Sequence, residues 1–413
     1  MKKILYLFAA AALLWSCSSY EKNDPEISPG DVWTSDGEYG GDIGGGGGTG
    51  SEGGQGQGQA GMVTAGEWRD LDNWLFWSNL MTTPQADQTG ADYTKYSEYW
   101  GLYTNNRVAV RVTDEAGVPQ RDVQVILNQH DGMLDIAPTT LYIGRTDNKG
   151  EVNLWIGLTQ LQDFVNEADL GLLVNGGAEV RTVTVTHWGE EVQWNECTTS
   201  VTPSTNIDIA FIVDATGSMT DEIDFLKADL KSIIQNVAAY DASANIRTAA
   251  VFYRDEGDEY ITRTNDFTTD LSNTAAFIAK QTAEGGGDFP EAVHTALEAG
   301  LQQLSWREDN SIRLVFMLLD APPHHETQVL ESLHQTIPQY AKKGIRIIPV
   351  AASGIDKPTE FFLRFTALAT DATYVFITND SGIGGEHIQA TVGDYEVELL
   401  NELIVRLIKQ YME

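Results

Sequence analysis

Residues 206–219 constrain the fold of this chain more than any other stretch. The run 207–213 is apolar except at Asp208, which is typical of a strand buried on both faces of a sheet. From Thr220 onward apolar residues recur at helical spacing, so a helix should follow the strand after a short loop. Later segments repeat this alternation of apolar strands and amphipathic helices. The pattern predicts an α/β domain with an open, doubly wound sheet over residues 202–413.

The loop between this strand and this helix is rich in side-chain oxygens. Asp214, Thr216 and Ser218 stand at alternate positions, and Gly217 allows the chain to turn tightly among them. The end of a strand and the start of a helix would bring one carboxylate and two hydroxyls around one point. Oxygen ligands of this kind suit a hard cation such as Mg²⁺, Ca²⁺ or Mn²⁺. The loop is therefore a candidate metal site.

The Asp-x-Thr-x-Ser pattern of this loop resembles the metal-ion-dependent adhesion site (MIDAS) of the von Willebrand factor A family, whose usual form is Asp-x-Ser-x-Ser. That family supplies two further ligands from later loops. Residues 285–291 and 318–323 resemble those two loops, and they place Asp288 and Asp320 at the corresponding positions. Asp288 stands where the common pattern has Thr, although glycine-rich second loops ending in Asp-x-Pro-Glu occur in a branch of the family. The resemblance covers the chain from residue 202 to its end.

The resemblance implies a metal site for Mg²⁺ (or Ca²⁺ or Mn²⁺) built from five residues: Asp214, Thr216, Ser218, Asp288 and Asp320. It also implies that the strands preceding Asp214 and Asp320 are central neighbours in the sheet. The other interpretation is an ordinary helix cap beside loop carboxylates. Three converging acids would repel one another without a cation, which favours the metal. In the family the metal keeps one position open for a partner's acidic side chain, so the expected function is metal-dependent recognition of an extracellular or envelope protein, as adhesion or complex assembly.

The first residues predict export and a lipid anchor. Met1 and two lysines precede a short apolar run, as in a secretory signal that is too short to span a bilayer. Residues 14–17 resemble a bacterial lipobox, which implies a lipoprotein signal peptide over residues 1–17, lipidation at Cys17 and a surface-exposed outer-membrane lipoprotein. The alternative is ordinary cleavage and free secretion. Residues 18–64 are glycine-rich and predict a flexible tether.

Residues 65–201 are expected to form an aromatic-rich lead-in followed by a β-sandwich. The lead-in concentrates tryptophans and tyrosines, which either stack on sugars or pack into a core, and the accompanying leucines favour packing. Short alternating strands follow from residue 106. The order of their turn residues resembles carboxypeptidase-regulatory-like, immunoglobulin-like modules of bacterial surface proteins. An alternative function is glycan binding through this aromatic segment and the sandwich, with the α/β domain structural.

Charge and missing motifs exclude several functions. The 413-residue chain has 60 acidic and 26 basic residues, a formal net charge of −34, which repels nucleic acid and anionic membrane surfaces. Membrane contact is therefore expected only through the lipid. No nucleophile elbow, phosphate-binding loop or kinase signature is present, and His324-His325 lacks the second half of a zinc-protease helix. These observations favour a binding protein over an enzyme, with both histidines as loop or capping residues.

Overall fold

The computed structural model describes residues 63–83, 92–130, 137–160, 165–202, 204–308, 310–379 and 387–413. The expected signal peptide, Cys17 and all but the end of the expected tether lie outside these residues. Within the described part of the chain, no helix is both long enough and apolar enough to cross a membrane.

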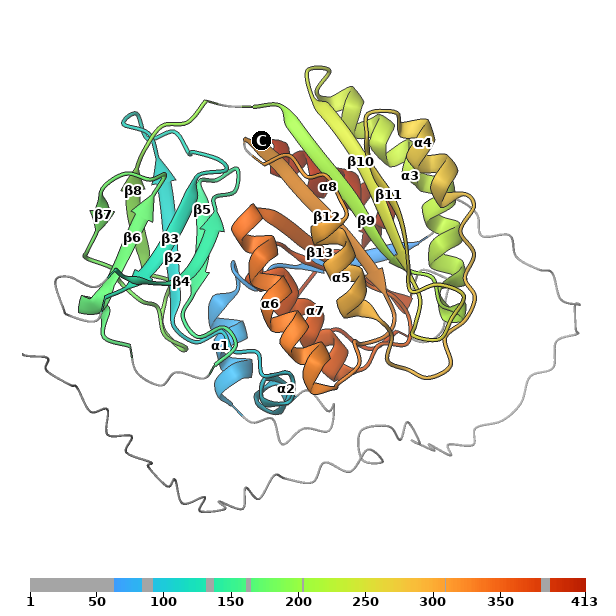
Figure 1. Ribbon diagram of the computed structural model, residues 1–413, viewed down its shortest axis with the longest axis horizontal. Helices are drawn as coiled ribbons and strands as arrows, with labels where there is room; N and C mark the ends of the chain where they lie inside the picture. Colours follow the sequence, from blue (N-terminus) through green and yellow to red (C-terminus); the bar gives the residue numbers. More distant parts are fainter. Residues whose placement is uncertain are drawn as a thin grey trace, which may run out of the picture. The chain divides into compact units, whose positions relative to one another are not determined.

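The largest structure is an eight-stranded mixed sheet (Figure 1). Five consecutive strands in the middle of the sheet run parallel to one another, whereas the strands at both sides are antiparallel to the strands they join. In spatial order the strands are β11 (Thr262–Thr268), β10 (Asn245–Tyr253), β9 (Asn206–Asp214), β12 (Ser311–Leu319), β13 (Ile345–Ala351), β14 (Tyr374–Ile377), β1 (Thr64–Trp68) and β15 (Glu398–Leu399).

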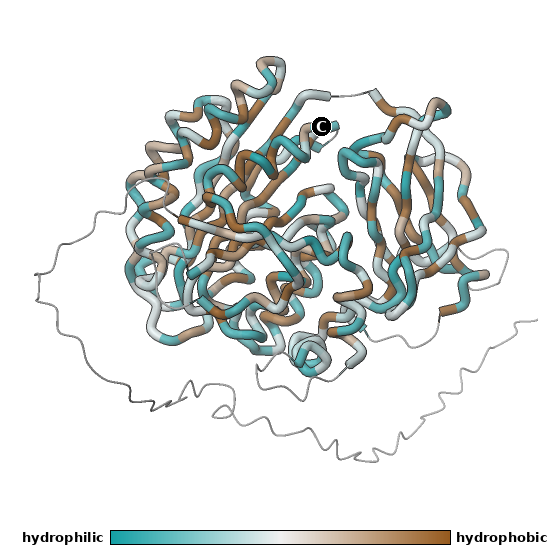
Figure 2. Tube along the Cα trace, turned by 180° about the vertical axis from the view of Figure 1, so that it is seen from behind, coloured by the Kyte–Doolittle hydropathy of each residue, from teal (hydrophilic) through white to brown (hydrophobic). Residues whose placement is uncertain are grey.

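Helices cover both faces of this sheet, as Figure 1 shows. One set consists of neighbouring helices α5 (Val293–Gln302), α6 (Thr327–Lys343) and α7 (Lys357–Ala369). The other consists of α3 (Thr220–Tyr240), α4 (Leu271–Ile278) and α8 (Leu400–Met412). Every residue of β12 is buried, and so is every residue of β9 after Asn206, because helices cover both of their faces. Figure 2 shows hydrophobic residues along these strands.

The sheet confirms the expectation that positions the candidate site. β9 pairs in parallel with β12, from Asn206 opposite Ser311 to Val213 opposite Leu318, so the strands that precede the two predicted aspartates are central neighbours. β10 lies on the other side of β9, and β11 pairs antiparallel with β10 at the edge. Such a sheet is consistent with the expected α/β domain.

The aromatic lead-in belongs to the large sheet rather than to the β region with which the sequence analysis grouped it. Strand β1 pairs with β14 and β15, with Ala65 opposite Ile377 and Glu398. The helices α1 (Trp74–Thr82) and α2 (Tyr93–Trp100) follow it. Trp77 is fully buried and stacks on Phe361 of α7 at 5.9 Å between ring centroids. The lead-in therefore joins the α/β part because its strand completes a sheet edge and its aromatic rings find a core there.

Residues 107–198 form two small sheets, here called the β region. One sheet contains β5 (Glu151–Trp155), β2 (Arg107–Thr113) and β8 (Trp194–Thr198). The other contains β4 (Thr139–Arg145), β3 (Gln124–Gln129), β6 (Leu170–Val174) and β7 (Glu179–Val180), with the short helix η1 (Glu167–Asp169) before β6. These seven strands match the expected short-strand pattern; their immunoglobulin-like identity stays a prediction.

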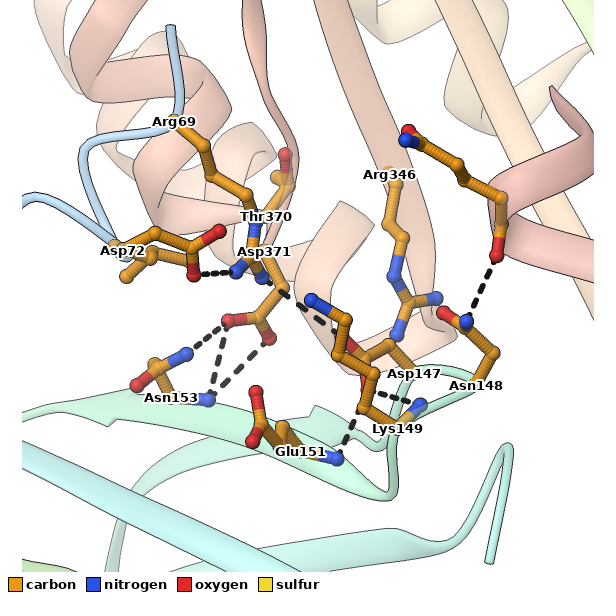
Figure 3. Close-up of polar contacts among 12 residues, drawn as sticks. Arg69, Asp72, Asp147, Asn148, Lys149, Glu151, Asn153, Arg346, Thr370 and Asp371 are labelled. Atoms are coloured by element: carbon orange, nitrogen blue, oxygen red, sulfur yellow. Dashed lines mark hydrogen bonds and ion pairs between the residues drawn. The ribbon is translucent and has the colours of Figure 1, made fainter. Parts of the chain in front are cut away.

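Buried polar contacts connect the β region to the α/β part. Asp371, after α7, accepts hydrogen bonds from the backbone N–H (3.2 Å) and the side-chain amide (2.6 Å) of Asn153 in β5 (Figure 3). Arg313 of β12 donates to both carboxylate oxygens of Asp122, at 2.9 and 3.1 Å, and both side chains are buried. These contacts join the β region to the end of α7 and to the central strand β12 of the large sheet.

Candidate metal site

Asp214 is held at the end of β9 by the loop that follows it. Its side chain is fully buried, and its Oδ1 accepts hydrogen bonds from the backbone N–H of Thr216 (2.8 Å) and from the Thr216 hydroxyl (2.7 Å). The short turn η2 (Gly217–Met219) then leads directly into α3. The local fold thus fixes one carboxylate oxygen of Asp214 and leaves the other, Oδ2, without a protein partner among the described residues.

Asp320 lies beside this loop because it directly follows β12, the parallel neighbour of β9. Its side chain is buried, and burial raises the pKa of its carboxyl group, while a hydrogen bond with the Ser218 side chain partly offsets that rise. Ser218 itself is exposed. The structure therefore brings four predicted site residues together across the first and third loops: Asp214, Thr216, Ser218 and Asp320.

The two aspartates form a buried acidic pair whose carboxylate oxygens are only partly satisfied by neighbouring N–H and hydroxyl donors. Burial and the nearby negative charge of Asp320 raise the pKa of Asp214 to about 7. Asp214 Oδ2 and Asp320 Oδ1 are both buried, and neither has a hydrogen-bond partner in the described chain. Orphaned buried carboxylate oxygens are costly. Together with the two hydroxyls they match the oxygen donor set that hard divalent cations prefer.

No larger acidic or histidine cluster contributes to this donor set. Among the residues that the structure describes, no group of three or more His, Cys, Asp or Glu side chains is arranged to hold a metal ion. The candidate site therefore rests on two carboxylates and two hydroxyls, which are four of the five residues that the resemblance implies.

The second loop approaches the first through its backbone. Gly217 N–H donates to Gly285 O (3.2 Å), and Glu284 N–H donates to Ala215 O (3.0 Å). Asp288, the predicted ligand of this loop, has an exposed side chain, which makes no contact with Asp214 or Asp320 within the described part of the chain. The structure therefore brings the second loop to the site but does not bring the Asp288 carboxylate into contact with the acidic pair.

Glu291 is the acidic residue of the second loop that faces the site. Its side chain is buried, and its N–H donates to Pro322 O of the third loop (2.9 Å). A Cβ atom on Gly286 would lie 2.9 Å from Glu291 Oε1 and 3.2 Å from the Cβ of Thr216. Burial and the charges of Asp214 and other acids raise the pKa of Glu291 to about 9. Glu291 thus lies where all three loops meet.

Sequence analysis did not single out Glu291, Glu222 or Tyr253. Glu222, in the first turn of α3, is buried, and neither of its carboxylate oxygens has a well-formed hydrogen bond within the described part of the chain. Burial raises its pKa to about 7, and nearby backbone N–H groups, including that of Ser353, limit the rise. Tyr253 ends β10. Its pKa is raised well above the usual value, mainly by burial and to a smaller extent by the negative charge of Asp214. The only available signal was the Pro-Glu pair that ends the second loop; for Glu222 and Tyr253 no local pattern distinguishes them from surface and core residues.

Two hollows of the described surface lie away from this site. One of about 620 Å³ is lined by residues such as Trp68, Tyr395 and Tyr411, and one of about 860 Å³ lies between α3 and α8. Their linings include neither Asp214 nor Asp320.

Comparison with known proteins finds similarity in the part of the chain that contains the candidate metal site. A sequence model of the von Willebrand factor A domain matches residues 208–371. A putative ariadne-like RING finger protein of Acanthamoeba polyphaga mimivirus is 34% identical over 131 residues, which is 32% of this chain and 12% of that protein. An alpha-protein kinase of Dictyostelium discoideum is 31% identical over 120 residues, which is 29% of this chain and 19% of the kinase.

The matched segment begins inside β9 and ends at Asp371, so it contains the three loops described above. The chain spans less than a fifth of the length of either relative, and the similarity therefore concerns a domain rather than a whole protein. Residues 208–371 of this chain form a von Willebrand factor A domain.

Proposed function

We propose that the von Willebrand factor A domain of this chain recognises a partner protein through a divalent cation held by Asp214, Thr216, Ser218 and Asp320. The observation that carries this proposal is the pair of buried carboxylate oxygens, Asp214 Oδ2 and Asp320 Oδ1, that have no hydrogen-bond partner in the described chain. Two hydroxyls lie against the same two carboxylates. A domain of this kind generally mediates protein–protein interaction, which agrees with a recognition role.

Each residue has a separate task in this proposal. The Thr216 N–H and hydroxyl fix Asp214 Oδ1, so the carboxylate presents Oδ2 without the freedom to rotate. Ser218 contacts Asp320 from the first loop and so connects the two strand ends. The N-terminus of α3 begins just after Ser218, and its dipole favours an incoming anion. When bound, the cation supplies attraction for an acidic side chain of the partner.

The cation proposed is Mg²⁺, with Ca²⁺ and Mn²⁺ as alternatives, because all three favour oxygen ligands. Asp288 remains a proposed member of the site from the resemblance, either directly or through water. Its exposed position and the buried position of Glu291 make the contribution of the second loop a question for mutagenesis.

The cellular setting follows from the N-terminal sequence. We propose an outer-membrane lipoprotein that is anchored through Cys17 and exposed at the cell surface, with residues 18–64 as a tether. The β region would then be an immunoglobulin-like spacer, which its seven strands in two small sheets support. The partner would be an extracellular or envelope protein. Binding rather than enzymatic turnover is proposed, and the activities named for the two relatives are not transferred to this chain.

Glycan binding by the aromatic lead-in is the less favoured function. Trp74 and Trp77 are 3% and 0% exposed, so neither ring can stack on a sugar from solvent. Trp77 instead stacks on Phe361 inside the core. Trp68 is the half-buried tryptophan of the segment, and it lines the hollow of about 620 Å³.

Partner capture with and without a chelator tests the proposed function. The described part of the chain from residue 63 onward, immobilised as bait, should retain a specific extracellular or envelope protein in Mg²⁺ and release it in EDTA. Asp214→Asn should lose the same protein, because the amide cannot replace the charge. Asp241→Asn, at the far end of α3, is the matched control and should bind normally. Retention that ignores both EDTA and Asp214→Asn would overturn the proposal.

A further inference from the structure

Two consecutive histidines fasten the loop that presents Asp320. His324 Nε2–H donates to Asp255 Oδ1 (2.7 Å), just after β10. His325 Nε2–H donates to the backbone carbonyl of Tyr99 (2.6 Å) in α2. The loop between β12 and α6 is therefore held from two sides, by the turn after a neighbouring strand and by a helix of the N-terminal lead-in.

The contact with α2 also involves the rings. Tyr99 and His325 stack with centroids 3.6 Å apart and planes 14° apart. Trp100 meets the edge of His325, with centroids 5.4 Å apart and planes at 67°. Planar stacking against a half-buried tyrosine fixes the orientation of His325, so the loop that carries it has less freedom to move.

The helix α2 is itself anchored firmly enough to hold the loop. Trp100 is 1% exposed, and its indole N–H donates to Pro358 O at the start of α7 (3.0 Å). His334 of α6 donates to the Trp100 carbonyl (2.8 Å). The next residue, Gly101, ends α2 in the left-handed conformation (φ +62°), where a Cβ atom would lie 3.0 Å from His334 Cε1.

We propose that α2 positions the Asp320 loop through Tyr99 and His325, so that cation binding and the docking of the N-terminal lead-in are energetically coupled. The inference rests on the cation site proposed above. It adds a support that lies more than a hundred residues before the matched domain segment in sequence. Coupling between two sites is reciprocal: if docked α2 favours the cation, the bound cation must favour docked α2.

Variants at Tyr99 test the first half of this coupling. The Tyr99 ring, not its hydroxyl, makes the described contact with His325, so Tyr99→Phe should bind Mg²⁺ like the native protein in a calorimetric titration. Tyr99→Ala should bind it about fivefold to tenfold more weakly. Tyr103→Ala, which removes a half-buried tyrosine just beyond α2, is the control and should leave the affinity unchanged.

Hydrogen exchange of the chain from residue 63 onward tests the second half. Addition of Mg²⁺ should slow amide exchange in α2 (residues 93–100) of the native protein, and this slowing should be absent in Tyr99→Ala. A merely structural role of Tyr99 would change exchange equally with and without Mg²⁺.

These experiments distinguish a failure of the proposed coupling from a failure of the proposed cation site. If Mg²⁺ binds and Asp214→Asn abolishes binding, but Tyr99→Ala binds normally and α2 exchange ignores Mg²⁺, the coupling is wrong and the cation site stands. If Asp214→Asn binds Mg²⁺ like the native protein, the cation site itself is wrong, and the coupling is overturned with it.

Discussion

The carboxylate of Asp371 accepts hydrogen bonds from both the backbone and the side-chain amide of Asn153, at 3.2 and 2.6 Å, although 218 positions separate the two residues. The contact joins the end of the von Willebrand factor A domain segment to β5 of the β region. Burial raises the pKa of Asp371 to about 6, and the nearby guanidinium of Arg346 and the Asn153 bond limit that rise.

Asp371→Asn should change how stability depends on pH. Because the folded pKa lies above the ordinary value of 3.8, the protonated form favours folding: the contribution is complete below about pH 4 and is lost as the pH rises through 6. Asn removes this titration and tolerates the left-handed backbone of residue 371 (φ +56°). Between pH 4 and pH 7, the free energy of unfolding of the native chain should therefore fall relative to that of the variant by on the order of 2–3 kcal/mol. Denaturant unfolding at a series of pH values measures this difference. Parallel pH profiles for the two proteins would contradict the assignment.

The buried pair between Asp122 and Arg313 should matter more for stability than exposed ion pairs do. Asp122→Asn tolerates the left-handed backbone of residue 122 (φ +59°) but leaves the fully buried guanidinium of Arg313 without its carboxylate, so the free energy of unfolding should fall by about 3 kcal/mol. Glu196→Ala breaks the exposed pair with Arg111 and should cost less than about 1 kcal/mol. Urea unfolding of both variants measures the difference, and equal losses would show that the Asp122 contact does not hold the β region to β12.

Paired variants distinguish the contributions of Glu291 and Asp288 to Mg²⁺ affinity. Glu291→Gln removes a buried carboxyl group beside Asp214 and Asp320 that is protonated at neutral pH, because its pKa is raised to about 9, and that can ionise when a cation binds. We therefore expect about a tenfold loss of Mg²⁺ affinity, the factor that corresponds to one pKa unit of interaction free energy. Asp288→Asn changes an exposed side chain and should lower the affinity less than about threefold, since exposed charges are screened by water. Calorimetric titration of both variants decides between them, and the reverse order would make Asp288 the contributor from the second loop.

The central strands and their aspartates could be predicted because their signals are local. The uninterrupted apolar runs of β9 and β12 indicate strands buried on both faces, and polar residues at their ends indicate loops. That Asp214 and Asp320 lie side by side follows from the strand order of such a sheet.

The place of the lead-in could not be predicted, because it depends on a contact across most of the chain. Ala65 pairs with Ile377, and a strand of five residues carries no sign of which sheet edge it will join. Similarly, the Glu291 side chain is buried where its backbone N–H donates to Pro322 O, which belongs to a different loop. The sequence pattern indicates the loop but not which of its two acids faces the site.

Direct titration of the chain from residue 63 onward with Mg²⁺ tests the central claim. Calorimetry should show saturable binding of a single cation by the native protein and no binding by Asp214→Asn, while Asp241→Asn binds normally and all three unfold at similar denaturant concentrations. Native-like Mg²⁺ binding by a folded Asp214→Asn variant would contradict the account, because the ion would then be held somewhere other than between Asp214 and Asp320.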